Sequence, residues 1–507
     1  MQYLLAIDLG TSGVKTVVYE ENGKAVVSVI KEYPLYQPHN GWAEQDPREW
    51  WEGCVAAIRG VLAESRISSA AIAGVGFSGQ MHGLVMVDQA GEVLGRSIIW
   101  CDGRTVAECE EVNEQLGEKT IFDLTANPFL PNFTASKVCW VRKHDPELWE
   151  RCRYILLPKD YIRYRLTGVI ASEVSDASGT NLLDVRNRVW SEQMLHALSI
   201  PPEYMPPLVG SSEIAGKISA EAARMTGLVE GIPVVAGAAD NAAAAIGTGV
   251  VEKGKAFLTL GTSGVIFAHA DTPSMDPKGR VHTFCSAVPG AYAVISCTLC
   301  AGGALQWLRD QFFAQEVLAA QGLQCDPYEI LCAQAAKVPI GANRLLFLPY
   351  LMGERSPLLD PDARGVFFGL SCAHTRYDLM RAVMEGVVFS QRANYDVLRE
   401  MGIEFSALLV TGGGGRSELW RQMLADVLEC PVSPVRNPQG AALGAAILAG
   451  IGTGLYSGFS QACRVMVQEG DTQLPVPIQT AQYMPYYAQY QKLYPRLQAA
   501  FSELAAL

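Results

Sequence analysis

Alternating apolar and polar residues predict two β-hairpins far apart in the chain. Residues 3–7 and 15–19 are mostly apolar and flank the turn Asp-Leu-Gly-Thr-Ser-Gly. Residues 256–259 and 265–268 flank a similar turn. Two strands with period-2 character on either side of a Gly-rich turn are typical of a β-hairpin.

The two hairpins share one hexapeptide. Leu-Gly-Thr-Ser-Gly-Val occurs at residues 9–14 and again at residues 260–265, close to half the chain apart. An identical segment in the same context indicates an internal repeat. We therefore predict two related α/β domains, residues 1–248 and 249–507, that meet in the Gly-containing stretch 247–255.

Between the hairpins the first half reads as mixed α/β. Residues 47–62 carry apolar side chains near helical spacing, after Asp46 as a cap and Pro47 in the first turn. We predict strands over residues 70–75 and 84–87, and a more helical region over residues 108–230.

A strand, glycine turn and helix follow one another in the second half. The apolar run 407–410 leads into four glycines at 412–415 and an amphipathic helix over 417–428. Bare backbone and a helix N-terminus can approach a nucleotide. About twenty residues on, Arg436 stands where a dinucleotide-binding fold needs an acid, which disfavours a Rossmann dehydrogenase. A Walker A loop is absent from the sequence.

Composition narrows the class of protein. The 507 residues are 49% hydrophobic and 18% charged, which fits a globular enzyme of at least two domains. The formal net charge is -12, and no basic stripe could neutralise a phosphate backbone. Nucleic acid and an anionic membrane are therefore not expected partners.

Two uncharged stretches, 285–308 and 437–463, raise the question of a membrane span. Glycines and a proline interrupt them, so we expect both to be buried core elements. The 13 Cys and the lack of a signal-peptide pattern predict reduced thiols and a cytoplasmic location.

The first hairpin turn has the chemistry of a phosphate cradle. Its glycines allow unusual backbone conformations, the Thr11 and Ser12 hydroxyls can face an anion, and Lys15 lies nearby. An ordinary Gly-rich hairpin is the alternative. Two copies favour two loops that hold one polyphosphate between them.

Two aspartates follow apolar strands. Asp240 lies in a long uncharged stretch, where a carboxylate is costly unless it is paired, metal-bound or functional. It is the leading catalytic candidate, and a helix N-cap before residues 242–246 is the alternative. Asp8 is a second candidate, with a strand-end turn residue as its alternative.

Histidine and cysteine give two weaker signals. His82 lies among small residues and beside Gln80 and Met81, so a ligand could fit there. His282, Cys285, Cys297 and Cys300 formally have zinc-ligand spacing, but buried cysteines are common in apolar strands and we expect core residues.

In chain order, these motifs resemble the FGGY carbohydrate kinase family, and the likeness covers nearly the whole chain. The motifs are Ile7 to Ser12, Gly79 to Gly83, Trp100-Cys101-Asp102-Gly103-Arg104, Gly237 to Asn241, Leu260 to Gly264, Gly412 to Ser417, a C-terminal signature from Gly365 to Glu385, and an N-terminal signature at Thr134, Lys137 and Trp140. Two residues depart from the pattern: Asn132 stands where a small or aromatic residue is usual, and Gln439 where an acid is frequent.

The resemblance implies two ribonuclease-H-like domains, as in actin and hexokinase, that close on ATP and a sugar. It implies ATP-dependent phosphorylation of a ketopentose, with D-xylulose expected from the Ser-Gly-Gln-Met-His-Gly stretch. Asp240 would be the general base, and Asp8 would assist through Mg²⁺ or ordered water. Asp8 and Asp240 are therefore the expected Mg²⁺ ligands.

The same resemblance implies the binding residues. The expected sugar contacts are Gln80, Met81, His82, Trp100, Asp102, Arg104, Asp240 and Asn241. The expected ATP contacts are Thr11, Ser12, Lys15, Gly261, Thr262, Ser263, Gly413, Gly414 and Ser417. ATP and a sugar are the expected partners, and a homodimer is compatible with them.

Three alternatives stay open from the sequence. Another FGGY kinase could act on gluconate, ribulose or glycerol, because only residues of the sugar pocket separate these enzymes. A non-enzymatic actin-like ATPase could use the same nucleotide loops, although it would not need the Met-His motif. A zinc-dependent protein is the third.

Overall fold

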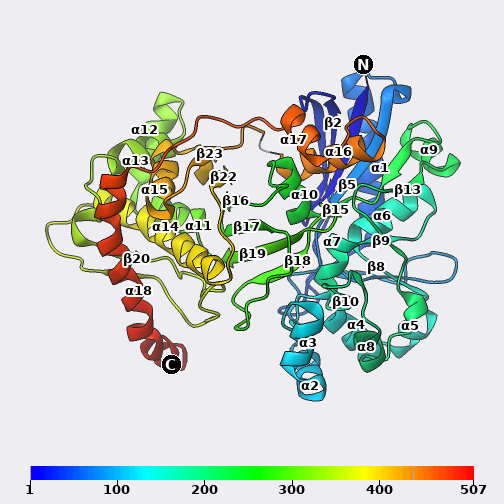
Figure 1. The fold of residues 1–507 in the computed structure, drawn as a ribbon, viewed down its shortest axis with the longest axis horizontal. Helices are drawn as coiled ribbons and strands as arrows, with labels where there is room; N and C mark the ends of the chain where they lie inside the picture. The colour runs from blue at the N-terminus through cyan, green and yellow to red at the C-terminus, as the bar shows by residue number, and fades with distance from the viewer. Residues whose placement is uncertain (1, 438) are drawn as a thin grey trace.

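Two mixed β-sheets organise the computed structural model, which describes residues 2–437 and 439–507 (Figure 1). The first sheet has 7 strands in the order β13-β14-β5-β1-β2-β3, with β15 beside β5. These strands are β1 (Tyr3–Leu9), β2 (Gly13–Glu20), β3 (Ala25–Glu32), β5 (Ile72–Gly79), β13 (Ile214–Lys217), β14 (Pro233–Val235) and β15 (Ala238–Ala239).

The second sheet has 6 strands in the order β18-β19-β17-β16-β22-β23. They are β16 (Lys255–Leu260), β17 (Gly264–Ala270), β18 (His282–Cys285), β19 (Tyr292–Thr298), β22 (Ala407–Thr411) and β23 (Val432–Pro434). This sheet lies near the middle of the molecule in the view of Figure 1.

Both sheets repeat one arrangement. β1 pairs antiparallel with β2 and parallel with β5, and β16 pairs in the same way with β17 and β22. β2 pairs antiparallel with β3, as β17 does with β19. The two predicted hairpins are confirmed, and the likeness extends well beyond the repeated hexapeptide. The division at residue 248 stays a prediction.

Helices of the first half cover its sheet and build a smaller subdomain. α1 (Pro47–Ser65) packs against β2 and β3, and its N-cap Asp46 accepts a hydrogen bond from the Arg48 amide, as predicted. The others are α2 (Val106–Leu116), α3 (Glu118–Thr125), α4 (Thr134–His144), α5 (Pro146–Arg151), α6 (Pro158–Thr167), α7 (Val174–Ala177), α8 (Glu192–Ala197), α9 (Ala220–Thr226) and α10 (Asp240–Gly247). The short strands here are β4 (Glu44–Gln45), β6 (Val85–Val87), β7 (Ser97–Ile98), β8 (Tyr154–Leu156), β9 (Ser172–Glu173), β10 (Leu183–Asp184), β11 (Val189–Trp190) and β12 (Leu208–Val209).

Helices of the second half bury the other sheet. α14 (Arg376–Glu400) contacts β17, β19 and the short strand β20 (Leu346–Leu348), which pairs with β21 (Val366–Phe368). The predicted helix over 417–428 is α15 (Glu418–Leu428), with Ser417 as its N-cap. The others are α11 (Gly302–Phe312), α12 (Ala314–Leu323), α13 (Pro327–Ala335), α16 (Gly440–Gly452), α17 (Phe459–Met466) and α18 (Pro477–Ala505).

Helix α16 belongs to the second half of the sequence but packs on the first sheet. It contacts β1, β5 and α10, and Figure 1 shows it with α17 beside these blue and green elements. Its apolar side chains share one core with residues of both sheets, among them Leu4 and Phe257. The hairpin repeat did not predict this crossing, so the sequence halves are not independent structural units.

Strand β5 is longer than the sequence predicted. The prediction ended at Val75, whereas the strand runs to Gly79 and contains Gly74, Gly76 and Gly79. Glycine is needed at position 76 because a Cβ there would lie 1.9 Å from the carbonyl oxygen of Ala445 in α16. These glycines therefore let a helix approach the strand and do not end it.

No helix in residues 2–437 and 439–507 is long and apolar enough to cross a membrane. The stretches that raised this question are core elements instead: β19 and α11 in one, and α16 and α17 in the other. All 13 cysteines are free thiols.

Candidate active site

Three neighbouring parallel strands end at the same edge of the first sheet and carry the main candidates. Strand pairing aligns Leu9 of β1 with Gly79 of β5, and Gly79 with Ala239 of β15. Gln80 and Asp240 directly follow two of these strand ends, while Asp8 lies one residue before the third. The structure thus gathers Asp8, Gln80 and Asp240 at one sheet edge.

Asp240 is the first residue of α10, and Ala239 is the N-cap. The N-cap alternative for Asp240 is therefore wrong. Its Oδ1 accepts a hydrogen bond of 2.6 Å from the Asn241 amide. Burial raises the pKa of Asp240 to about 7, the Asn241 amide opposes this, and the negative charge of Asp8 adds to it. Near neutral pH this carboxyl can both hold and release a proton.

Asp8 carries a second carboxyl at this edge. Burial raises its pKa, while the charge of Lys15 and the Ser78 hydroxyl act against the rise. Lys15 is the cross-strand partner of Asp8 in the hairpin, which explains the closeness of the two charges. Ser12 is exposed at the hairpin turn. The predicted phosphate cradle thus has a cation beside Asp8 and an exposed serine at its turn.

A hydrogen-bond network joins the hairpin turn to the Gln80 loop. Thr11 Oγ1 accepts from Trp100 Nε1 at 2.9 Å and donates to Gln80 Oε1 at 3.4 Å. Gln80 Nε2 donates to Gln45 Oε1 at 3.0 Å. Thr11, predicted for ATP, therefore contacts Gln80 and Trp100, which were predicted for the sugar.

His82 and Met81 form an aromatic and apolar corner. His82 Nδ1 lies 2.6 Å from the carbonyl oxygen of Gly179, and its ring centroid is 4.5 Å from that of Phe133. Burial lowers the pKa of His82 to about 3, with the charge of Lys137 adding to the effect. Because the ring is neutral and Nδ1 donates to Gly179, Nε2 is left as a hydrogen-bond acceptor.

Asp102 and Arg104 are paired with each other. The Arg104 guanidinium donates to both carboxylate oxygens of Asp102, with Nη2 to Oδ2 at 2.7 Å, and Nη2 also reaches Glu44 at 2.8 Å. The side chains of Asp102 and Arg104 are 0% and 2% exposed. This ion pair can hold the loop that carries Trp100 in place. Contact of either side chain with the sugar stays a prediction.

Five of the six predicted ATP residues of the second half line one cavity of about 880 Å³. Its lining includes Gly261 and Thr262 after β16, Gly413 and Gly414 after β22, and Ser417 at the start of α15. Ser263 completes the hairpin turn, where its carbonyl accepts from the Gly261 amide. A cavity of this size between two Gly-rich loops and a helix N-terminus suits a nucleotide.

Close backbone approach shapes this cavity. The Gly302 amide donates to the Gly261 carbonyl at 2.7 Å, and a Cβ on Gly302 would lie 2.5 Å from that oxygen. A Cβ on Gly413 would meet nothing within 4 Å, so its backbone borders open space. Glycine at position 302 therefore allows close backbone packing, whereas glycine at position 413 leaves the backbone open to the cavity.

Both halves of the chain match domain models of one protein family. Residues 3–247 match the N-terminal domain and residues 256–453 the C-terminal domain of the FGGY family of carbohydrate kinases. The chain belongs to this family. A xylulose kinase of Bacillus subtilis is 38% identical over 494 residues, which is 97% of each chain. A gluconokinase of the same organism is 34% identical over 482 residues, covering 94% of this chain and 92% of its own.

A crystal structure of xylulose kinase from Rhodospirillum rubrum has a TM-score of 0.91 to this FGGY kinase at 31% identity, covering 99% of this chain and 100% of that one. The expected fold of two actin/hexokinase-like domains is confirmed. The chain is an ATP-dependent sugar kinase, so the non-enzymatic alternative does not hold.

Several site residues of this FGGY kinase were missed by sequence reasoning. The lining of the 880 Å³ cavity also includes Tyr328, Cys332 and Ala333 of α13 and Arg416. Only the Asp-Pro helix start before α13 could have drawn attention there. Phe133 beside His82 had no distinguishing signal.

The four residues with zinc-ligand spacing do not form a site. His282 Nδ1 lies 2.9 Å from Asn127 Oδ1, and its Nε2 lies 2.6 Å from Arg355 Nη2. Cys285 and Cys300 are buried in the core of the second half, and Cys297 lies at the end of β19. Within the described part of the chain, no three His, Cys, Asp or Glu side chains are placed to hold a metal ion.

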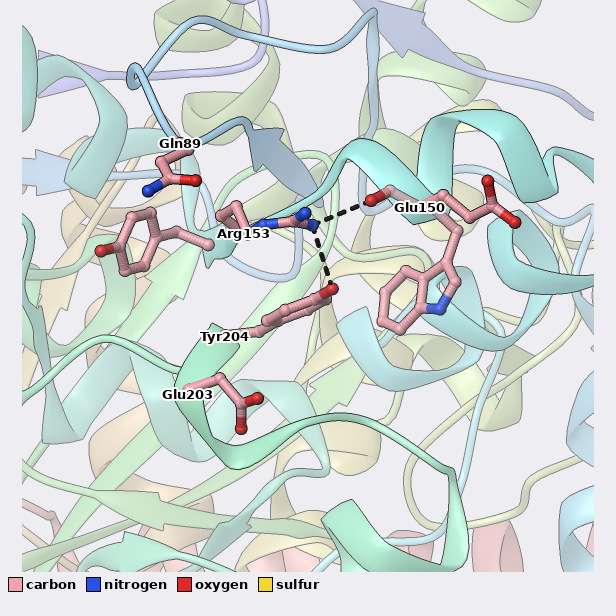
Figure 2. Close-up of a pocket in the computed structure, with 7 residues that line it drawn as sticks. Gln89, Glu150, Arg153, Glu203 and Tyr204 are labelled. Carbon is pink, nitrogen blue, oxygen red and sulfur yellow. Dashed lines mark hydrogen bonds between the residues drawn. The ribbon is translucent and has the colours of Figure 1, made fainter.

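A second hollow, of about 650 Å³, lies on the first half and contains none of the predicted site residues. Figure 2 shows Arg153 at its centre, donating to the Glu150 carbonyl at 2.8 Å and to the Tyr204 hydroxyl at 3.4 Å. Gln89, Arg153 and Glu203 are exposed, so this is an open surface feature.

Proposed function

We propose that this kinase transfers the γ-phosphoryl group of ATP to D-xylulose, giving D-xylulose 5-phosphate and ADP, with Asp240 as the general base. The observation that carries the proposal is the gathering of Asp8, Gln80 and Asp240 at one sheet edge beside the neutral His82. The names of the relatives at 38% and 31% identity support the choice of sugar.

In the proposed reaction, the sugar hydroxyl gives its proton to Asp240 as its oxygen forms a bond to the γ-phosphorus. The bond from that phosphorus to the bridging oxygen breaks, and ADP leaves with the electron pair. Phosphoryl transfer needs mainly positioning and charge neutralisation, so no covalent nucleophile is required. A base with a pKa of about 7 is well matched to proton transfer near neutral pH.

The two sides of the site have separate tasks in this proposal. His82, Met81 and Asn241 contact the sugar, with Gln80 and Trp100 fixing the loop that faces it. Gly261, Thr262 and Ser263 bind phosphates, while Gly413, Gly414 and Ser417 lie along the adenosine. Thr11, Ser12 and Lys15 of the first hairpin face the transferred phosphate.

Asp8 and Asp240 fit a magnesium ion. Mg²⁺ in kinases uses one or two carboxylates and takes its other ligands from substrate phosphates and water. The charge of Asp8 raises the pKa of Asp240, and both carboxyls lie at the same edge of the first sheet. A magnesium ion held by these two carboxyls would neutralise charge that develops during phosphoryl transfer.

The test is ADP release with a panel of acceptors: D-xylulose, D-ribulose, D-gluconate and glycerol. We expect the highest kcat/KM with D-xylulose. A higher value with D-gluconate would favour the second candidate, a gluconate kinase, for which the 34% identical gluconokinase is the reason. An Asp240→Asn variant that binds ATP normally but has no kinase activity would support Asp240 as the base.

A further inference from the structure

A fully buried ion cluster lies behind the strand that leads to Asp240. Lys159 Nζ contacts three carboxylates, those of Asp160 at 2.9 Å, Asp176 at 3.1 Å and Glu173 at 3.3 Å. Arg163 adds a second cation, 2.8 Å from Asp160. All five side chains are 0% exposed. Buried charges are costly unless they are paired, so the cluster needs a reason.

The cluster places two cations among three carboxyl groups. Burial alone would raise the pKa of Asp160, but the charges of Lys159 and Arg163 lower it. Burial raises the pKa of Asp176, and Lys159 does not offset the rise because Asp160 and Glu173 share the same cation. Four ion pairs join these five side chains into one buried body.

This body holds residues 236–239, the segment that ends in β15 and delivers Asp240, at two points. Arg163 Nη1 donates to the Ala236 carbonyl at 2.9 Å. The Ala239 amide donates to Ser175 Oγ at 3.1 Å, and that hydroxyl donates to Glu173 Oε1 at 2.8 Å. β15 pairs with β5 on one side only, so Ser175 supplies the partner that a further strand would give to a buried amide.

The cluster also packs directly against the neighbouring strand. A Cβ on Gly79 would lie 2.7 Å from Lys159 Cβ, and Gly79 is aligned with Ala239 in the sheet. The two residues before Gln80 and Asp240 therefore rest on the same support, which fixes their separation.

We propose that Ser175 and Arg163 are positioning residues for catalysis: through hydrogen bonds to Ala239 and Ala236 they fix the backbone that places the Asp240 carboxylate at the sugar hydroxyl. This inference rests on the proposed function, because it requires Asp240 to be the base. Neither side chain touches substrate. Loss of either side chain would act by displacing Asp240, and a displacement near 1 Å costs about a hundredfold in rate.

The test compares Ser175→Ala with Ser172→Ala. Both serines are 1% exposed and each donates one hydrogen bond to a carboxylate of the cluster, Ser175 to Glu173 at 2.8 Å and Ser172 to Asp160 at 2.7 Å. Ser175 in addition accepts from the Ala239 amide. The two variants thus remove similar bonds from the same cluster but differ in their link to Asp240.

We expect Ser175→Ala to lower kcat for D-xylulose about ten- to a hundredfold, with the KM values for D-xylulose and ATP within about twofold of wild type. Ser172→Ala should keep kcat within about twofold while losing a similar amount in Tm. The concentration of ATP-binding sites is measured by fluorescence titration with an ATP analogue, so that kcat is calculated per folded enzyme molecule. If Ser175→Ala cannot be purified, Ser175→Cys serves, because a thiol is a weaker donor and acceptor in the same place.

Equal kcat values for the two serine variants, or a change in KM alone, would overturn the positioning role. An Asp240→Asn variant measured in parallel separates the two claims. If it is inactive while the serine variants match each other, only the positioning inference fails. If it keeps near-normal turnover, the proposed function fails.

Discussion

The single buried cation Lys137 supports the loop that we propose to contact the sugar. Its Nζ donates to the carbonyl oxygens of His82 and Asn132, both at 2.7 Å. His82 has a φ of 67°, a left-handed conformation that a residue other than glycine adopts only when its surroundings hold it. The N-terminal signature marked Lys137 in the sequence, but only the structure shows that it supports His82.

Lys137 should make stability depend on pH. Burial lowers the pKa of Lys137 from 10.5 to about 7, against the opposing charge of Asp102. Between these values the unfolded chain binds more protons than the folded one, so folding gains stability as pH rises. We expect the unfolding free energy of wild type, relative to Lys137→Met, to rise above about pH 7 with a slope of up to about 1.4 kcal/mol per pH unit.

Urea unfolding of both proteins between about pH 6 and pH 9 measures this difference. The exposed Lys253 provides the control, since Lys253→Met should differ from wild type by an amount independent of pH. A pH-independent difference for Lys137→Met would contradict the burial of a titrating amine.

At the scale of elements, the contact of α16 with α10 depends on glycine. A Cβ on Gly444 would lie 1.8 Å from the Ala243 carbonyl oxygen, while a Cβ on Gly322 in α12 would meet nothing within 4 Å. Gly444→Ala should therefore lower stability by about 1–3 kcal/mol through overpacking. Gly322→Ala should be neutral or stabilising by up to about 1 kcal/mol, because alanine favours a helix. Thermal unfolding of the pair checks this, and equal Tm values would contradict the close helix contact.

Helix α13 forms one wall of the cavity proposed to bind ATP, so a change there should affect ATP alone. Ala333 lines that cavity, whereas Ala319 is an equally exposed alanine on α12. Ala333→Phe should raise the KM for ATP about tenfold, a loss of about 1.4 kcal/mol of binding, and leave the KM for D-xylulose unchanged. Ala319→Phe should change neither value. Steady-state kinetics with each substrate varied in turn measures these KM values. Equal effects of the two variants would contradict ATP binding beside α13.

At the scale of the whole molecule, the sequence predicted the parts that local patterns encode. The hexapeptide at residues 9–14 and 260–265 predicted both hairpins, and these proved to be the centres of two similarly ordered sheets. Asp240 stood out because a charge interrupts an apolar stretch. Such features are local in sequence and carry their own physical signal.

Contacts between distant segments had no such signal. The packing of α16 on β5 joins Ala445 to Gly76, and the support of Asp240 joins Ser175 to Ala239. A small residue or a serine looks the same in a sequence whether it faces solvent, a helix or a catalytic strand. The sequence therefore indicated which residues could act, while the structure was needed to show what holds them in place.

If Asp240 is the base of this sugar kinase, replacing this one carboxyl group should stop the reaction. Asp240→Asn keeps the size of the side chain but cannot accept the proton. We expect D-xylulose-dependent ADP release to fall by at least about a hundredfold, with the fold and the affinity for ATP close to wild type. Turnover near the wild-type rate in a well-folded Asp240→Asn protein would contradict it.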